Sequence, residues 1–302
     1  MKLSGISVVI LTFNEERHIE RCIRSVTGVA TDIFVVDSFS TDATTSIADS
    51  LGAKVYQNSW VNYATQFNWA LATLPIKTDW VFRLDADEII DDNLGSVLKN
   101  LTGYIDPGVT GIYVKRKIIF LGQWIKHGGM YPVQTLRIFR YGAAFCEMRW
   151  MDEHIKITMG RTISLAGNVV DNNFNNIGWW ITKHNGYATR EAIDILNFRY
   201  GFMAYDGVEP RITGNQVQRK RWLKTRYASL PLFVRPFVYF LYRYVVRFGF
   251  LDGVRGLIWH FLQGFWYRFL VDVKIYEIFI NSGRTKEGIK LFLKDAYGIS
   301  LE

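Results

Sequence analysis

The sequence predicts an α/β protein with a mostly parallel sheet flanked by helices, followed by a helical C-terminal region. Strand-like runs alternate with helix-like segments over about the first hundred residues, as in βαβ units. The chain has 302 residues, of which 49% are hydrophobic, so we expect a sizeable core and no global disorder. Basic and aromatic residues set the last third of the chain apart.

Hydrophobic patterns assign the N-terminal elements. Continuous β-branched runs such as Ile6–Leu11 are typical of strands covered on both faces. In Glu15–Val26 the apolar residues recur at helical spacing. The other expected strands are Ile33–Val36, Lys54–Tyr56 and Trp80–Leu84, and the other expected helices are Thr41–Leu51, Ala64–Leu74 and Asp92–Asn100.

From Gly111 onward, strand-like runs are joined by glycine-rich connections. Strands are expected at Ile112–Phe120, Leu136–Phe139 and Ile155–Ile157, and a helix at Trp179–Phe198. We therefore divide the chain into a domain of residues 1–205, with halves 1–110 and 111–205, a linker at 206–218 and a helical region at 219–302.

Charge is distributed unevenly along the chain. Residues 215–302 hold 15 basic and 6 acidic side chains, whereas residues 1–214 hold 21 and 22. This excess favours an anionic partner for the C-terminal region, either a membrane surface or nucleic acid. Two cysteines, Cys22 and Cys146, make no disulfide framework and indicate a reducing, cytosolic setting. No uncharged apolar run of about 18 residues exists, so no spanning helix is expected.

The C-terminal region predicts an amphipathic helix. On a helical wheel one side carries Val234, Phe237, Leu241, Tyr244, Val245 and Phe248, and the other carries Arg235, Tyr239, Tyr242, Arg243 and Arg247. Apolar and cationic faces of this kind are typical of helices that lie in a membrane interface. The alternative is a helical subdomain packed on the N-terminal domain or on a second subunit.

Polar residues follow three of the expected strands: Thr12-Phe13-Asn14, Asp37-Ser38 and Asp85-Ala86-Asp87. Ligands of parallel sheets bind outside the carboxyl ends of the strands, so these segments should meet in one crevice. Asp85 and Asp87 suit a hard divalent cation with bound phosphates, although a solvated acidic turn would look the same. Asp37 could accept hydrogen bonds from a base or ribose, or could cap the next helix.

Four motifs occur in order along this region: Val8–Glu16 (VVILTFNEE), Val35–Asp42 (VVDSFSTD), Gln66-x-Asn68-x-Ala70 and Arg83–Glu88 (RLDADE). In order and spacing they resemble the family 2 glycosyltransferases, which have the GT-A fold. The later part of the chain is similar to the branch that builds lipopolysaccharide core and exopolysaccharide. The resemblance implies a catalytic domain over residues 1–205, with a nucleotide-sugar half and an acceptor half.

The resemblance also implies roles for single residues. Thr12, Phe13, Asn14 and Glu15 would line the nucleotide pocket, Asp37 would contact the base, and Gln66 and Asn68 would lie near the base or ribose. Asp85 would face the ribose or the waters of a bound Mn²⁺ or Mg²⁺, and Asp87 would bind that metal directly. The expected donor is a nucleotide-diphosphate sugar, with UDP as the first choice of nucleotide.

The acceptor side needs a general base, and a positioned carboxylate is the usual choice. Asp152 and Glu153 are the candidates, because the family has an acidic motif at about this place. His154 could complete the metal shell or orient a phosphate, or could be structural. Arg137 could bind the diphosphate or an acceptor phosphate through its guanidinium, or could lie on a solvated strand face.

We therefore expect an inverting, metal-dependent hexosyltransferase that acts on a lipid-linked saccharide. It would lie on the cytoplasmic face of the inner membrane as a peripheral or monotopic protein at an anionic surface, with a homo-oligomer as one option. A sugar-phosphate nucleotidyltransferase is the first alternative, but the acidic loop after the first strand is unsuited to a triphosphate. A non-catalytic binder of anionic surfaces is the second. No nucleic-acid partner is expected, because the strand-end carboxylates would repel its phosphates.

Overall fold

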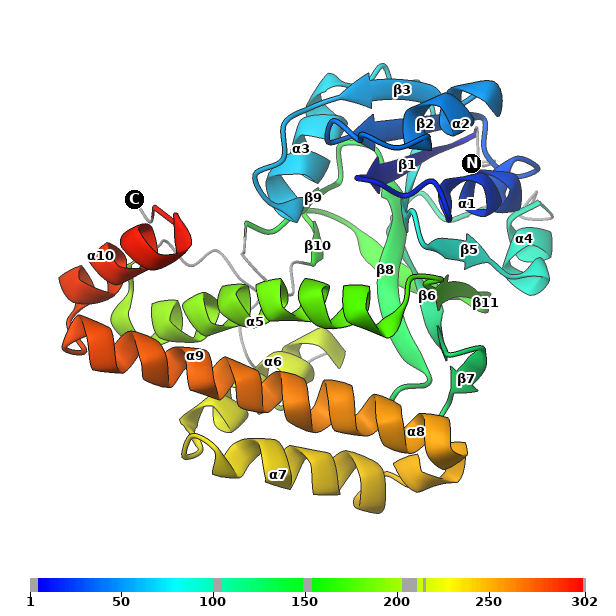
Figure 1. The fold of residues 1–302 in the computed structure, drawn as a ribbon. Coiled ribbons are helices and arrows are strands. Elements are labelled where there is room, and N and C mark those ends of the chain that lie inside the picture. Colours follow the sequence, from blue (N-terminus) through cyan, green and yellow to red (C-terminus); the bar gives the residue numbers. More distant parts are fainter. Residues whose placement is uncertain (1–4, 100–104, 149–153, 203–210, 214–215, 301–302) are drawn as a thin grey trace. The chain divides into compact units, whose positions relative to one another are not determined.

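A computed structural model describes residues 5–99, 105–148, 154–202, 211–213 and 216–300. They form two compact units, which are described separately (Figure 1). The described part of the N-terminal unit runs up to Glu147 and continues from residue 154 to Phe174. The other unit begins at Asn175 and includes the C-terminal helices.

A nine-stranded mixed sheet forms the N-terminal unit, with the order β3-β2-β1-β4-β8-β6-β11-β5 and with β7 paired to β6. The first four strands of this order are parallel, whereas β8 runs antiparallel to both β4 and β6. The strands are β1 (Ile6–Thr12), β2 (Asp32–Asp37), β3 (Lys54–Gln57), β4 (Trp80–Asp85), β5 (Glu88–Ile90), β6 (Val109–Phe120), β7 (Gln123–Ile125), β8 (Val133–Arg140) and β11 (Arg161–Asn172). The short strands β9 (Ala144–Cys146) and β10 (Ile155–Ile157) form a separate pair.

Helices cover both faces of this sheet. One core lies between the sheet and the helices α1 (Ile19–Val26), α2 (Thr44–Ser50) and α4 (Asp92–Lys99). The core on the other face includes α3 (Tyr63–Thr73) and the β9–β10 pair. Strands β1, β2 and β4 are buried almost throughout because both faces are covered, as their β-branched composition predicted.

The predicted α/β class is confirmed, and each strand and helix expected in residues 1–99 is present within a few residues of its expected ends. The long strand β11 was not predicted. Its pairing with β6 shifts register between Ser164 and Asn168, next to Gly167. At Gly167 φ is +96°, and a Cβ would lie 2.4 Å from the backbone nitrogen of Leu94. The glycine permits this close approach but interrupts the strand pattern in the sequence.

The C-terminal unit is helical. Its core joins one face of α5 (Ile177–Tyr200) to α9 (Tyr267–Ser282) and α10 (Lys286–Tyr297). Between these lie α6 (Gln216–Ser229), α7 (Val234–Leu241), α8 (Gly253–Trp259), the π-helical turns η1 (Tyr242–Val246) and η3 (His260–Trp266), and the 3₁₀ turn η2 (Gly249–Asp252). No helix in the described ranges is both long enough and apolar enough to cross a bilayer.

Helix α5 accounts for a difference from the expected domain division. The sequence analysis placed this segment in the domain of residues 1–205. In the structure, Ala188, Ala192 and Leu196 of α5 share a core with Val271 and Ile275 of α9. The compact C-terminal unit therefore begins at Asn175, before α5.

Candidate active site

The ends of three neighbouring parallel strands form one polar edge. Thr12 at the end of β1 is paired in register with Asp37 at the end of β2, and Leu11 is paired with Asp85 at the end of β4. The three polar segments that the sequence places after these strands therefore start side by side. This is the edge at which open α/β sheets bind their ligands.

Asp37 is fully buried and holds the loop that follows β2. Its carboxylate accepts hydrogen bonds from the Thr12 hydroxyl at 3.0 Å, from the backbone N–H of Ser40 at 2.8 Å, and from the Ser40 hydroxyl. The Gln57 amide nitrogen lies 3.5 Å from Oδ2 of the same carboxylate. Asp37 is thus engaged by its own loop. It does not cap α2, whose N-cap residue is Ala43, so the capping interpretation of Asp37 was wrong.

The loop after β1 is tied to the same structure. Asn14 has a positive φ of 54°, and its side-chain oxygen accepts a hydrogen bond from the backbone N–H of Thr41 at 2.9 Å. The backbone N–H of Glu15 donates to the Thr44 hydroxyl at 2.7 Å. Phe13 is 57% exposed, so its ring is available at the surface of this edge. An exposed aromatic ring beside polar loops is suited to stacking on a planar base.

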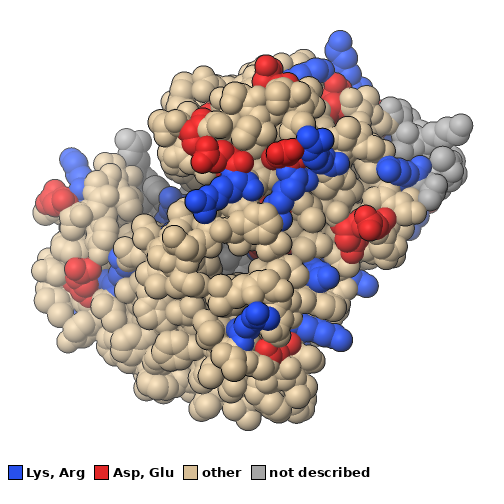
Figure 2. Space-filling view, turned by 45° about the vertical axis from the view of Figure 1, so that its right-hand side comes forward, with Lys and Arg blue, Asp and Glu red and all other residues tan. Residues whose placement is uncertain are grey.

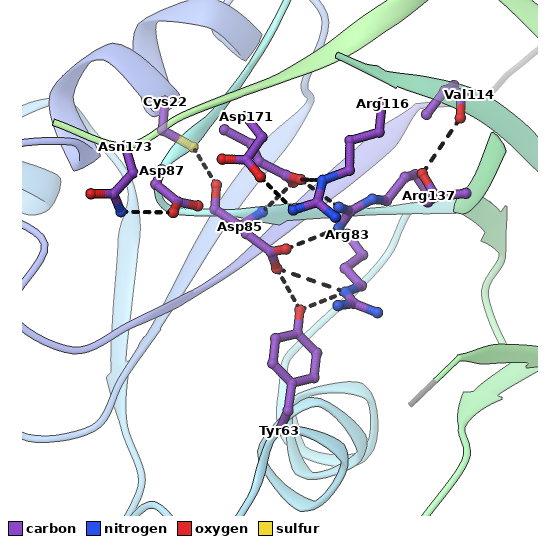
Figure 3. Close-up of polar contacts among 12 residues, drawn as sticks. Cys22, Tyr63, Arg83, Asp85, Asp87, Val114, Arg116, Arg137, Asp171 and Asn173 are labelled. Atoms are coloured by element: carbon purple, nitrogen blue, oxygen red, sulfur yellow. Dashed lines mark hydrogen bonds and ion pairs between the residues drawn. The ribbon is translucent and has the colours of Figure 1, made fainter. Parts of the chain in front are cut away.

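Asp85 lies at the centre of a dense polar network (Figure 3). The Tyr63 hydroxyl donates to its Oδ1 at 2.7 Å, and Arg137 Nη1 lies 3.3 Å from its Oδ2. The Arg83 Nε lies 3.8 Å from Oδ1. Burial raises the pKa of Asp85, but the Arg137 and Arg83 guanidinium groups outweigh that effect and hold the pKa well below its usual range.

The network continues as a row in which acidic and basic side chains alternate. Asp85, Arg137, Glu88, Arg116 and Asp171 come from β4, β8, β5, β6 and β11, one residue from each strand. Arg137 donates to Glu88, and Arg116 pairs with Asp171 and lies 3.8 Å from Glu88. Burial raises the pKa of Glu88 to about 8, despite the opposing effect of Arg137. Arg137 is buried, so the solvated-face interpretation of it was wrong.

Asp87 has a different environment. Its Oδ2 accepts a hydrogen bond from the neutral amide of Asn173 at 2.9 Å, and no arginine forms an ion pair with it among the described residues. Arg21 donates to the backbone oxygen of Asp87 at 2.7 Å and also to that of Asn172, so the turn is pinned to the end of β11. The charge of Asp87 also attracts the Arg21 guanidinium, although the two form no ion pair. A carboxylate held in place by an amide and not by a direct ion pair fits a hard divalent cation.

Gln66 and Asn68 both lie on α3 but form hydrogen bonds with different segments of the chain. The Gln66 amide is buried and donates to the Ser38 hydroxyl at 3.2 Å, beside Asp37. The Asn68 amide donates to the carbonyl of Cys146 at 2.8 Å and accepts from its N–H, also at 2.8 Å. Gln66 thus joins the strand-end edge, whereas Asn68 ties α3 to β9.

The expected acceptor-side residues fall only partly within the structure. Asp152 and Glu153 lie outside the described residues. His154 Nδ1 lies 3.0 Å from Oε1 of the buried Glu147. Within the described ranges, no group of three His, Cys, Asp or Glu side chains is arranged to hold a metal ion, so His154 does not join Asp85 and Asp87 in such a cluster.

Sequence reasoning did not single out several members of this network: Tyr63, Glu88, Arg116, Asp171 and Asn173. Glu88 was visible as the last residue of the RLDADE motif. The others come from α3, β6, β11 and the residue after β11, which only the folded chain brings to Asp85 and Asp87.

With this geometry established, the chain was compared with known proteins. The family model described as glycosyl transferase family 2 matches residues 7–163, which include every strand-end residue of the site. The chain belongs to glycosyl transferase family 2. The match covers more than half of the chain, and together with the mixed sheet it confirms the predicted GT-A class.

Three bacterial proteins illustrate what this family 2 glycosyltransferase is similar to. An uncharacterized glycosyltransferase of Rickettsia typhi is 27% identical over 283 residues, which cover 93% of this chain and 89% of the relative. The lipopolysaccharide core biosynthesis glycosyltransferase LpsC of Rhizobium meliloti is 30% identical over 142 residues, 45% of this chain and 51% of LpsC. Glucosyl-3-phosphoglycerate synthase from Mycobacterium tuberculosis, solved with Mg²⁺ and UDP, is 27% identical, with a TM-score of 0.31 over 38% of this chain and 43% of that one.

Proposed function

We propose that this glycosyltransferase moves a sugar, with inversion, from a nucleotide-diphosphate sugar to a saccharide acceptor in cell-surface polysaccharide or lipopolysaccharide synthesis. The observation that carries the proposal is the contrast between Asp85 and Asp87 at the end of β4. Asp85 is bound by Tyr63 and Arg137, whereas Asp87 is bound by an amide. One carboxylate is therefore fixed and charge-compensated, and the other is suited to direct metal binding.

The donor would lie along the edge formed by β2, β1 and β4. Phe13 offers a ring for the base, and the loop that Asp37 organises, with Ser38 and Gln66, offers polar groups beside it. Asp85 would accept a hydrogen bond from the ribose or from metal-bound water. UDP is the nucleotide we propose, in line with the family resemblance of the strand-end motifs.

Asp87 would hold Mn²⁺ or Mg²⁺, and Asp85 would support it through water. When bound, the cation would neutralise the charge that develops on the leaving diphosphate. Asn173 keeps the Asp87 carboxylate oriented, and Arg21 fixes the backbone of the turn. Asp152 or Glu153 would deprotonate the acceptor hydroxyl as it attacks the anomeric carbon.

We further propose a lipid-linked acceptor and a peripheral or monotopic position on the cytoplasmic face of the inner membrane. The basic excess of residues 215–302 supports this proposal, because cationic segments are attracted to anionic headgroups. So does the similarity to LpsC, whose name places that protein in lipopolysaccharide core synthesis.

A screen of nucleotide sugars with purified full-length protein tests the proposed reaction. UDP-sugars should be hydrolysed or transferred with release of UDP, and the rate should depend on added Mn²⁺ or Mg²⁺. Asp87→Ala should lower this rate by at least about a hundredfold at saturating metal. The control, Asp106→Ala, removes an exposed carboxylate that pairs with Arg161 and should keep the wild-type rate.

Other outcomes count against the proposal. Release of pyrophosphate from a nucleoside triphosphate would instead indicate a nucleotidyltransferase. Binding of nucleotide sugars without turnover, with and without vesicle-bound acceptors, would indicate a non-catalytic binder. Wild-type turnover by Asp87→Ala would reject the metal role of that carboxylate.

A further inference from the structure

Helix α7 turns its cationic side into the protein. Arg235 is buried, and its Nε donates to Asp272 of α9 at 2.8 Å, where Asp272 is also fully buried. Asp272 accepts a second hydrogen bond from the backbone N–H of Phe233 at 2.8 Å. Arg243 of η1, eight positions further on, is buried as well, with its guanidinium 5.5 Å from the centre of the Tyr239 ring.

A second ion pair, buried on the Glu191 side and half-buried on the Arg268 side, extends this polar layer. Glu191 of α5 accepts hydrogen bonds from Arg268 and from the Tyr267 hydroxyl, both on α9. The Arg268 guanidinium also lies 5.6 Å from the centre of the Tyr239 ring of α7. Buried charges are tolerated only when they are paired, so these contacts fix the orientation of α7 about its own axis.

The apolar side of α7 consequently faces outward, together with the turns that follow it. Between residues 234 and 261 thirteen large apolar side chains are exposed: Val234, Phe237, Val238, Leu241, Tyr242, Val245, Val246, Phe248, Phe250, Leu251, Val254, Leu257 and Phe261. We call these residues the apolar face. In Figure 2 the surface of the C-terminal unit over α7 and α8 is largely tan, with few charged side chains.

Contacts between rings link parts of this face to one another and to the core beneath it. Phe237 of α7 lies 4.5 Å from Phe265 of η3, measured between ring centres, and Phe265 lies 5.4 Å from Phe261. Further along, Phe248 lies 6.1 Å from Phe250 of η2. Soluble monomers rarely expose an apolar surface of this extent, and those that do use it to bind something.

The exposed charges within the same segment all have one sign. Arg247 and Arg255 are exposed, whereas the segment's one acidic residue, Asp252, is 4% exposed. An apolar surface with aromatic rings and arginines complements a bilayer whose headgroups are anionic. A symmetric dimer through this face would instead set the arginines of one copy near those of the other and would have to offset their repulsion.

We propose that the apolar face inserts into one leaflet of a phospholipid bilayer, and that the buried Arg235–Asp272 pair, with the contact of Arg268 to the Tyr239 ring, holds it in the inserting orientation. The inference deepens the proposed membrane-bound function and rests on it. It also changes the expected mode of binding. The helical wheel led us to expect a cationic face toward the headgroups, but of its three arginines Arg235 and Arg243 are buried and only Arg247 is exposed. Insertion of apolar side chains therefore dominates, and electrostatic attraction is secondary.

Sedimentation of full-length protein with vesicles tests this mode. We expect binding to phosphatidylcholine vesicles, stronger binding when phosphatidylglycerol is added, and retention of most binding at high salt. Leu241→Glu should weaken binding by at least about tenfold, because a charge replaces an inserted apolar side chain. Val254→Glu, at another exposed point of the face, should act in the same direction. Leu291→Glu is the matched control, since Leu291 is similarly exposed on α10, outside the apolar face, and should bind as the wild type does.

The outcomes separate this inference from the proposed reaction. Equal binding by Leu241→Glu, Leu291→Glu and the wild type would overturn insertion, as would binding that high salt abolishes. A lipid-free dimer that Leu241→Glu converts to monomer, without vesicle binding by the wild type, would assign the face to a second copy and overturn it too. Turnover of UDP-sugars in solution reports the proposed reaction independently: its absence in protein that binds vesicles as expected counts against the reaction alone.

Discussion

Arg137 Nη1 lies 3.3 Å from Asp85 Oδ2, while the other terminal nitrogen of the same guanidinium donates to Glu88. One buried arginine thus contacts two carboxyl groups, one on each side of the turn that carries Asp87. The arrangement fixes Asp85 without engaging Asp87. The side chains of Asp85 and Asp87, only two positions apart, therefore have different partners: an arginine for Asp85 and an amide for Asp87.

Removing Arg137 should therefore destabilise the N-terminal unit. We expect Arg137→Met to lower the free energy of unfolding by about 3–5 kcal/mol, because Glu88 and Asp85 would lose their buried partner. Adding Glu88→Gln to this variant should restore part of the loss. Urea unfolding of the two single variants and the double variant measures the coupling. If the effects of Arg137→Met and Glu88→Gln on the free energy of unfolding simply add, the two side chains do not interact. The control is Arg161→Met, at an exposed arginine, which should unfold as the wild type does.

Asp37→Asn tests the hydrogen bonds that the Asp37 carboxylate accepts at the end of β2. The amide cannot accept every hydrogen bond that the carboxylate receives from Thr12 and Ser40. One buried donor would lose its partner, so we expect a loss of about 1–3 kcal/mol in the free energy of unfolding. Calorimetric titration with UDP separates the two roles of Asp37: weaker binding by folded protein supports a donor contact, and unchanged binding assigns the residue to the loop alone. The exposed Asp49→Asn should change neither quantity.

Asp152→Asn and Glu153→Gln should identify the general base. Each change preserves the size of the side chain but removes the proton acceptor. The variant that has lost the base should lose sugar transfer by at least about a hundredfold while UDP affinity stays at the wild-type value. Rates of transfer and calorimetric titration with UDP give the two quantities. Near-normal transfer by both variants would show that the base lies elsewhere.

His184 in the C-terminal unit should make stability dependent on pH. Its ring stacks on Trp180 with 3.5 Å between ring centres, and burial lowers its pKa to about 4. The unfolded chain binds this proton at a pKa of about 6.5, so stability is fully present above that pH and falls as the pH drops toward 4. Between pH 6.5 and pH 4, His184→Gln should therefore lose about 2 kcal/mol less of its free energy of unfolding than the wild type loses. The free energy of unfolding at pH 8 serves as the reference for each protein. If the variant and the wild type lose the same free energy of unfolding between pH 6.5 and pH 4, His184 is not the group responsible.

The sequence by itself determined the α/β core and the strand-end motifs. Continuous β-branched runs such as Val8–Leu11 can be buried only between two helical layers, so local composition sufficed to place β1, β2 and β4. Because the carboxyl ends of parallel strands meet at one edge, Thr12, Asp37 and Asp85 could be grouped from their positions alone.

Only the tertiary structure decided which partners these groups receive. Asn173 reaches Asp87 from 86 positions away, and Arg137 reaches Glu88 from 49, so no local pattern could assign them. The orientation of α7 was decided in the same way. A helical wheel separates the apolar side of α7 from its cationic side but does not show which side is buried. The orientation of α7 is decided by Asp272 of α9, 37 positions after Arg235. Because the buried Asp272 carboxylate needs a cationic partner, α7 turns Arg235 toward α9.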